Sequence, residues 1–108
     1  MMGKIYSIHM LALKQDVTEE TVERFIREEW NPNFVPPPGF TGYLLKGVKG
    51  DRQGRYLWIW EFESLEAGER AEAEGLWHKP PDNQALIDKW YTFDKGFGTI
   101  FTDYEVIE

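Results

Sequence analysis

The stretch RYLWIWEFE, residues 55–63, decides the fold of this chain. Large aromatic residues occupy every second position of it, namely Tyr56, Trp58, Trp60 and Phe62. Leu57 and Ile59 fill positions between them. Side chains two residues apart on a β-strand point to the same face of a sheet. The stretch therefore predicts a strand whose two faces are both apolar.

The chain before this strand predicts its hairpin partner. Residues 40–49 alternate as a strand does, and GDRQG at residues 50–54 is a polar, glycine-bounded turn. A turn of about that length commonly joins two antiparallel strands. We therefore expect a β-hairpin over residues 40–63.

The chain after the hairpin predicts a helix in two pieces and a last strand. Ser64 is suited to cap a helix that runs to about residue 74. Pro80 and Pro81 then interrupt the chain, and Asp82 is suited to cap a second helical piece. The apolar stripe of this piece consists of Leu86, Ile87, Trp90 and Tyr91. Residues 97–107 read as the closing strand.

The N-terminal residues 4–13 read as the first strand. Their apolar run is short and interrupted by polar residues, which is not typical of a signal peptide. One face of this strand carries Tyr6, Ile8 and Met10, and the other carries Ile5, Ser7, His9 and Leu11. We place His9 and its neighbours on the side of a cavity between sheet and helices.

A helix follows this strand. Asp16 can form a capping box with Glu19, and Thr18 is a competing N-cap. Pro32 disfavours helical geometry at the preceding residue, which predicts that the helix ends near Trp30. The proline-rich residues 31–39 then form a stiff loop.

The resulting β-α-β-β-α-β order over residues 1–108 is the ferredoxin-like pattern of one α+β domain with a four-stranded antiparallel sheet. Right-handed crossovers place both helices on one face of the sheet and leave the other face uncovered. On the uncovered face we expect a large apolar patch of Tyr56, Trp58, Trp60, Phe62, Phe97, Phe101 and Leu11. Monomers rarely expose such a patch, so we expect a sheet-to-sheet homodimer. The alternative is a monomer in which residues 76–91 cover this face.

Composition excludes several classes of function. The net charge of −7 repels nucleic acid and anionic lipid, so we expect neither as a partner. Cysteine is absent, which rules out disulfides and thiolate chemistry and agrees with a cytoplasmic protein. The two histidines show no metal-ligand spacing with the carboxylates, so we expect no metal and no cofactor.

Three stretches resemble the dimeric α/β-barrel superfamily, which includes antibiotic-biosynthesis-type monooxygenases and EthD-like proteins. They are FIREEWNP (residues 25–32), PPPGFTGYLL (residues 36–45) and LWIWEFESLEAGERAEAEGLWHKP (residues 57–80). The resemblance implies a dimeric barrel and a small-molecule enzyme. Haem-degrading relatives carry an Asn on the first strand, where this chain has Ser7 and His9, which argues against haem oxygenation.

Few residues suggest chemistry. His9 is either a pocket base near neutral pH or a partly buried histidine hydrogen-bonded to a neighbour. His78 is either a ligand contact at a cavity mouth or an exposed loop residue. Asp103 is either a base with a raised pKa or a solvent-facing carboxylate. The acidic run within residues 61–74 is most simply a solvated helix face.

These residues lead to two hypotheses. The first is an enzyme, a cofactor-independent monooxygenase or an isomerase, that binds a hydrophobic or aromatic compound in a barrel cavity with His9 as the proton-transfer group. Its predicted substrate contacts are Trp58, Trp60, Tyr43, Phe101 and His78. The second is a non-catalytic dimer that binds or senses a hydrophobic ligand. A further reading treats the aromatic face purely as an interface.

Overall fold

The computed structural model describes residues 3–95 and 100–107. The chain is an α+β protein, and the predicted order of strands and helices is confirmed, including the division of the last helix into two pieces. Its elements are β1 (Ile5–Met10), α1 (Glu19–Phe25), a π-helical turn (Ile26–Trp30), α2 (Asn31–Asn33), β2 (Thr41–Lys46), β3 (Tyr56–Phe62), α3 (Leu65–Ala73), α4 (Asn83–Tyr91) and β4 (Phe101–Glu105). No described helix is long and apolar enough to cross a membrane.

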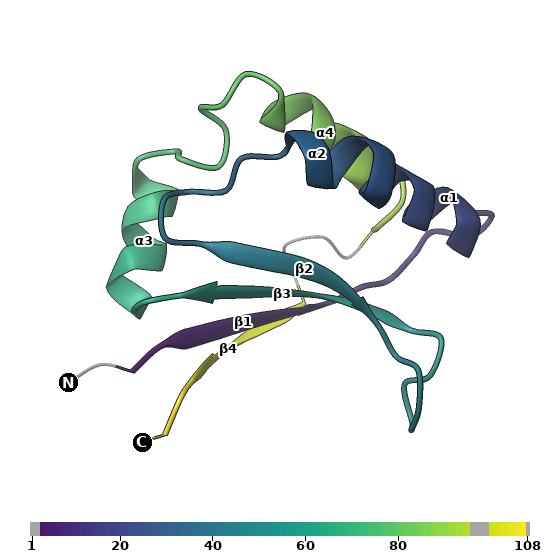
Figure 1. Ribbon diagram of the computed structural model, residues 1–108, viewed down its shortest axis with the longest axis horizontal. Helices are drawn as coiled ribbons and strands as arrows, with labels where there is room; N and C mark the ends of the chain where they lie inside the picture. The colour runs from purple at the N-terminus through teal and green to yellow at the C-terminus, as the bar shows by residue number, and fades with distance from the viewer. Residues whose placement is uncertain (1–2, 96–99, 108) are drawn as a thin grey trace.

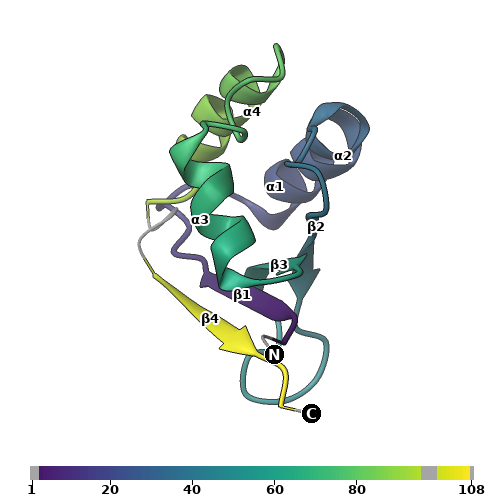
Figure 2. The same cartoon turned by 90° about the vertical axis from the view of Figure 1, so that its left-hand side faces the viewer.

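The four strands form one antiparallel sheet in the order β2-β3-β1-β4. The helices gather on one side of this sheet (Figure 1), and the view from its edge shows α3 lying over the central strands while α1 and α4 run side by side above them (Figure 2). The other side of the sheet is left without a helix. We call the two sides the covered face and the open face.

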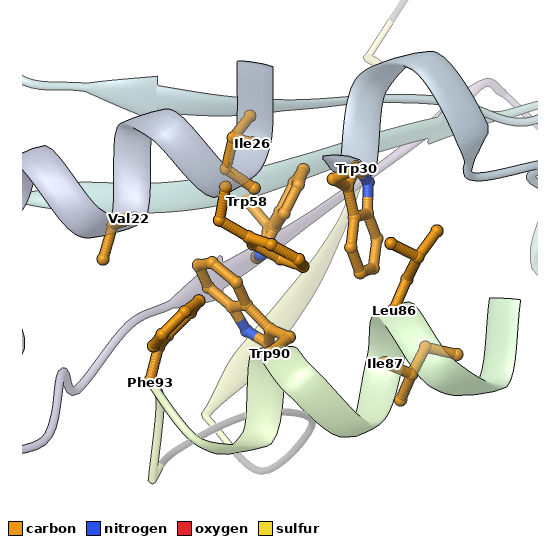
Figure 3. Close-up of a cluster of buried hydrophobic side chains, with 9 residues drawn as sticks. Val22, Ile26, Trp30, Trp58, Leu86, Ile87, Trp90 and Phe93 are labelled. Carbon is orange, nitrogen blue, oxygen red and sulfur yellow. The ribbon is translucent and has the colours of Figure 1, made fainter. Parts of the chain in front are cut away.

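The strand register decides which side chains lie on each face. His9 of β1 stands opposite Trp58 of β3 and Phe101 of β4, and all three therefore share the covered face. Trp58 is 2% exposed and packs against the π-helical turn after α1 and against α4 through the rings of Trp30 and Trp90. The main core is thus a layer of aromatic and aliphatic side chains between the sheet and these helices (Figure 3).

The expected placement of the aromatic stripe on the uncovered face is wrong. Tyr56, Trp58 and Phe62 are buried beneath the helices, with exposures of 5%, 2% and 6%. Large rings fill the wide gap between a sheet and the helices that cross it, and alternation alone does not state which face that is. Phe97 lies outside the described residues. The open face instead carries Tyr6, Ile8, Met10, Tyr43, Leu45, Leu57, Ile59, Thr102 and Tyr104.

The predicted helix ends are confirmed at two caps and wrong at Pro32. Thr18 and Ser64 accept hydrogen bonds from the backbone N–H groups two or three residues into α1 and α3, at 3.2 and 3.1 Å. The first helix does not end near Trp30 but continues to Asn33. A π-helical turn precedes Pro32, and the N–H of Asn31 donates to the carbonyl five residues back. This wider turn accommodates a ring that clashes with an ordinary α-helix.

Two predictions about the last helical piece, the cap at Asp82 and the place of Tyr91 in its apolar stripe, are wrong. Asp82 precedes α4, but its side chain makes no capping hydrogen bond. Leu86, Ile87 and Trp90 are buried as expected, whereas Tyr91 is 47% exposed. Tyr91 therefore does not belong to the core stripe.

Close contact between α3 and the sheet depends on a glycine. A Cβ atom on Gly68 would lie 2.9 Å from Cε2 of Phe62, which is closer than real side chains approach. The missing side chain therefore lets α3 lie directly on the ring of β3. Ala71, 1% exposed, packs beside it in the second core cluster. This contact fixes α3 as one wall of the site described next.

Candidate functional site

A cavity of about 390 Å³ lies between the covered face and the helices. Its residues come from three strands, from the π-helical turn, from α3 and α4, and from the connections after α2 and α3. They are Ser7, His9, Trp30, Phe34, Phe40, Trp60, Phe62, Leu65, Gly68, Glu69, Glu72, Trp77, His78, Ile87, Tyr91, Phe101 and Asp103. The volume is within the range of pockets that hold small organic molecules.

The cavity has an apolar floor and a polar mouth. Ser7, Trp30, Phe62 and Ile87 are buried, at 5%, 4%, 6% and 5% exposure, and form the floor. The exposed lining residues belong to the mouth, and they are Leu65, Glu69, Glu72, His78, Tyr91, Phe101 and Asp103. A ligand would therefore bury an apolar part and keep a polar part near water.

Aromatic rings form most of the wall. Trp60 and Trp77 meet edge to face with ring centroids 4.8 Å apart, and Phe34 lies 6.1 and 6.3 Å from these two rings. Trp30 stacks on Phe34 at 4.1 Å. Rings held in this way present both faces and edges to a ligand at little entropic cost.

A buried asparagine holds this wall in place. Asn83, 0% exposed, lies at the start of α4. Its amide Nδ2 donates to the carbonyl oxygens of Val35 and Trp77 at 2.7 and 3.0 Å, and its Oδ1 accepts from the N–H of Val35 at 3.0 Å. One side chain thereby ties the loop of Phe34 and the loop of Trp77 to the same helix.

His9 is the titratable group on the strand side of the cavity. Its Nε2 lies 2.9 Å from Oγ of Ser7, and its ring stacks on Phe101 with centroids 5.1 Å apart. Burial lowers the pKa of the imidazole, while the charges of Asp103 and Asp94 partly offset this effect. The ring is therefore neutral near pH 7. His9 is thus a partly buried histidine hydrogen-bonded to a neighbour, and it also lines the cavity. Its role as a base stays a prediction.

His78 and Asp103 lie at the mouth. His78 follows α3, is exposed, and its Nδ1 lies 2.7 Å from Oε1 of Gln84. Asp103 stands opposite Ser7 in the sheet register and is exposed. Both residues therefore meet a ligand only where it is in contact with solvent.

The structure brings together four of the six predicted site residues. His9, Trp60, Phe101 and His78 all line the cavity. Trp58 does not, because it is enclosed by the core and lies behind Trp60, whose ring is 5.8 Å away. It supports the wall instead of contacting a ligand.

Tyr43 was also predicted to contact a ligand, and it does not line the cavity. The register pairs it with Ile59 on the open face, and it is 60% exposed. Residues of β2 alternate between faces, and the covered-face neighbour of Tyr43 is Leu44, which packs against the core. Tyr43 is thus on the opposite side of the sheet from the cavity.

Sequence reasoning missed many of the lining residues, and five of them are instructive. Phe34, Phe40 and Trp77 belong to connections whose path a periodic pattern does not reveal. Glu69 and Glu72 were assigned to a solvated helix face. A signal for them exists, because Leu65, Gly68, Glu69 and Glu72 follow the i, i+3, i+4, i+7 spacing of one helix face.

Metal ligands do not converge in the part of the chain that the structure describes, where no group of three His, Asp or Glu side chains is placed to hold an ion. Comparison of this chain with protein-family models, curated proteins and solved structures found no match.

Proposed function

We propose that this protein is a small-molecule enzyme that binds a hydrophobic or aromatic compound in the cavity and transfers a proton with His9. The observation that carries the proposal is a neutral imidazole at the edge of an aromatic cavity, held by Ser7 at 2.9 Å. A general base must be deprotonated at the working pH and held in a fixed orientation. The lowered pKa of His9 favours its deprotonated form, and the contact with Ser7 orients its ring.

The tautomer of His9 in its hydrogen bond with Ser7 decides which ring nitrogen can act as the base. If Nε2 carries the proton and donates to Oγ of Ser7, then Nδ1 has a free lone pair for a substrate proton. Removal of a proton beside a carbonyl group begins an isomerisation, which ends when the proton returns to another carbon. The same step begins oxygenation without a cofactor, in which dioxygen is the co-substrate and the oxidant of the carbanion. Ser7 is a positioning residue in either reaction.

The open face supports the proposed homodimer. Tyr43, Leu45 and Tyr104 are 60%, 44% and 54% exposed on one continuous sheet surface. Burial of roughly 500 Å² of such surface contributes about 12 kcal/mol before the costs of association. Pairing of two open faces would give the dimeric α/β barrel that the sequence resembles.

Sedimentation equilibrium tests the dimer. We expect the protein to sediment at about twice the 12.7 kDa of one chain, and the variant Leu45→Glu to sediment as a monomer, because a charge in an apolar interface is costly. Val35→Glu is the matched control, since Val35 is similarly exposed, at 52%, but lies outside the sheet. A monomeric wild-type protein at high concentration contradicts the dimer.

A ligand screen tests the enzyme. Compounds that raise the melting temperature are incubated with the protein and then identified by mass. We expect at least one to be returned with altered bonds or mass, and His9→Gln to bind it but to turn it over about 10²- to 10⁴-fold more slowly. Undiminished turnover by His9→Gln would contradict the proposed role of His9.

A non-catalytic ligand-binding protein is the second candidate. Among the described residues, no carboxylate is hydrogen-bonded to His9, and Asp94 instead accepts from the N–H of Ala12 and from Nε1 of Trp90. Many enzymatic bases have such a carboxylate partner. The same screen separates the candidates, because a binding protein returns every compound unchanged.

A further inference from the structure

Among the described residues, the carboxylates that line the cavity form no salt bridge with Lys or Arg. Glu69 and Glu72 of α3 and Asp103 of β4 line it, and no Lys or Arg does so within the described ranges. None of the three lies within 4.0 Å of a Lys or Arg nitrogen in the part of the chain that is described. The mouth therefore has a negative potential that no side chain there neutralises.

The arrangement of α3 sets these two glutamates apart from its other acidic residues. Glu69 and Glu72 lie on the helix face that points to the cavity, beside Gly68, which contacts Phe62. Glu66 lies elsewhere on the helix and pairs with Arg70 at 3.6 Å. The acidic side chains without partners are thus the ones that face a ligand.

The walls behind the carboxylates also favour positive charge. The faces of Trp60, Trp77 and Phe34 are rich in π electrons, and a cation near such a face is attracted to it. His9 adds no opposing charge, because burial lowers its pKa and leaves the ring neutral. The carboxylates therefore favour a positive group at the mouth, and the rings favour an aromatic body beside it and tolerate its positive charge.

We propose that the ligand of this cavity is a cationic amine joined to an aromatic or other apolar body. Its ammonium group lies at the mouth against Glu69, Glu72 and Asp103, and its apolar body lies among the rings of Trp60 and Trp77. This inference rests on the proposed function, since it names the class of molecule that the same cavity binds. The net charge of −7 favours the approach of such a ligand and disfavours that of a carboxylate or phosphate.

Isothermal titration calorimetry at pH 7.5 and low salt tests this with three probes of one shape. They are 1-naphthylmethylamine, which is cationic, 1-naphthylmethanol, which is neutral, and 1-naphthoate, which is anionic. We expect the amine to bind at least tenfold more tightly than the alcohol, and the carboxylate to bind most weakly. The advantage of the amine should decrease as salt is added.

Two matched variants locate the charge that matters. Glu69→Gln with Glu72→Gln removes two charges from the cavity, and Glu66→Gln with Glu74→Gln removes two charges from the same helix region outside it. We expect the first pair to reduce the preference for the amine to about threefold or less while leaving the affinity for the alcohol unchanged. The second pair should keep the tenfold preference.

The outcomes separate this inference from the proposed function. Equal binding of amine, alcohol and carboxylate would overturn the inference and leave the cavity as a binding site. The inference would also be overturned if both pairs of variants reduce the preference for the amine equally, because net charge alone then explains the preference. Failure of all three probes to bind would contradict both proposals.

Discussion

The two faces of the sheet have similar sequences and different environments. On the covered face, Trp58 and Phe62 are almost fully buried, and the rings beside them enclose a cavity. On the open face, Tyr43 and Tyr104 are more than half exposed. Both faces are apolar, but only one has helices above it (Figure 2). An apolar strand face therefore predicts that the face packs against another apolar surface. Whether that surface is a helix of the same chain or a second molecule depends on the rest of the fold.

The largest expected effect comes from truncating the same kind of side chain on each face. Trp58→Ala should lower the free energy of unfolding by about 3–5 kcal/mol, because it leaves a large hole between β3, α1 and α4. Tyr43→Ala removes contacts only from the open face and should cost an isolated chain less than about 1 kcal/mol.

Urea unfolding at several protein concentrations measures both variants. In the proposed dimer, Tyr43→Ala should change the dependence on concentration more than the stability at high dilution. Equal losses from Trp58→Ala and Tyr43→Ala at high dilution would contradict the assignment of the two faces.

The next effect concerns the residue that fastens the cavity wall. Asn83→Ala should cost about 3 kcal/mol, because it removes three hydrogen bonds made by a fully buried side chain and takes these partners from the backbone groups of Val35 and Trp77. Gln84→Ala, at the exposed neighbouring position, is the control and should cost less than about 0.5 kcal/mol. Thermal unfolding measures both, and a loss for Asn83→Ala no greater than the control's would show that Asn83 does not hold the loops.

A smaller effect distinguishes two tyrosine–glutamate pairs. Tyr56 donates to Glu23 on the covered face, and burial and this hydrogen bond raise the pKa of Tyr56 to about 12. Tyr6 donates to Glu61 at 2.7 Å on the open face. Tyr56→Phe should cost about 1–2 kcal/mol and Tyr6→Phe about 0.5 kcal/mol, since Tyr56 is 5% exposed whereas Tyr6 is only half-buried, and a hydrogen bond contributes more where less water reaches it. Chemical unfolding of both variants in parallel measures the two losses of unfolding free energy. A larger loss for Tyr6→Phe than for Tyr56→Phe would contradict the prediction.

The smallest effect is a pH dependence at His9. The pKa of His9 in the folded protein is below its ordinary value of 6.5, so the unfolded chain binds a proton more readily. Stability from this residue is therefore fully present above pH 6.5 and is lost as the pH falls toward the pKa of the folded state. His9→Gln should flatten this part of the curve of unfolding free energy against pH. A variant curve that keeps the wild-type slope below pH 6.5 would contradict the lowered pKa.

Local signals in the sequence predicted the elements well. The alternation over residues 56–62 gave the strand and its two faces, and Ser64 capped α3 because its hydroxyl reaches the backbone of the first turn. Pro32 misled the assignment of a helix end. Its effect is local, and a π-helical turn one residue earlier removes the conflict while the buried Trp30 keeps the helix on the core.

The cavity was less predictable because it is a property of distant segments. His9 and Trp60 were found because they share a strand face with many apolar neighbours. Trp77 and Phe34 were missed because loops brought together by Asn83 form that wall, and no periodic pattern records such a contact. Tyr43 was misplaced for a simpler reason, since which face of β2 meets the helices depends on the register with β3.

The central claim is that the covered face holds the ligand and the open face does not. The most direct test is an NMR titration of the protein with the neutral probe 1-naphthylmethanol. We expect the indole N–H signals of Trp60 and Trp77 to shift in a saturable manner, while the backbone amide signals of Tyr43 and Tyr104 remain unchanged. Shifts confined to Tyr43 and Tyr104, with the two indoles unaffected, would contradict the account.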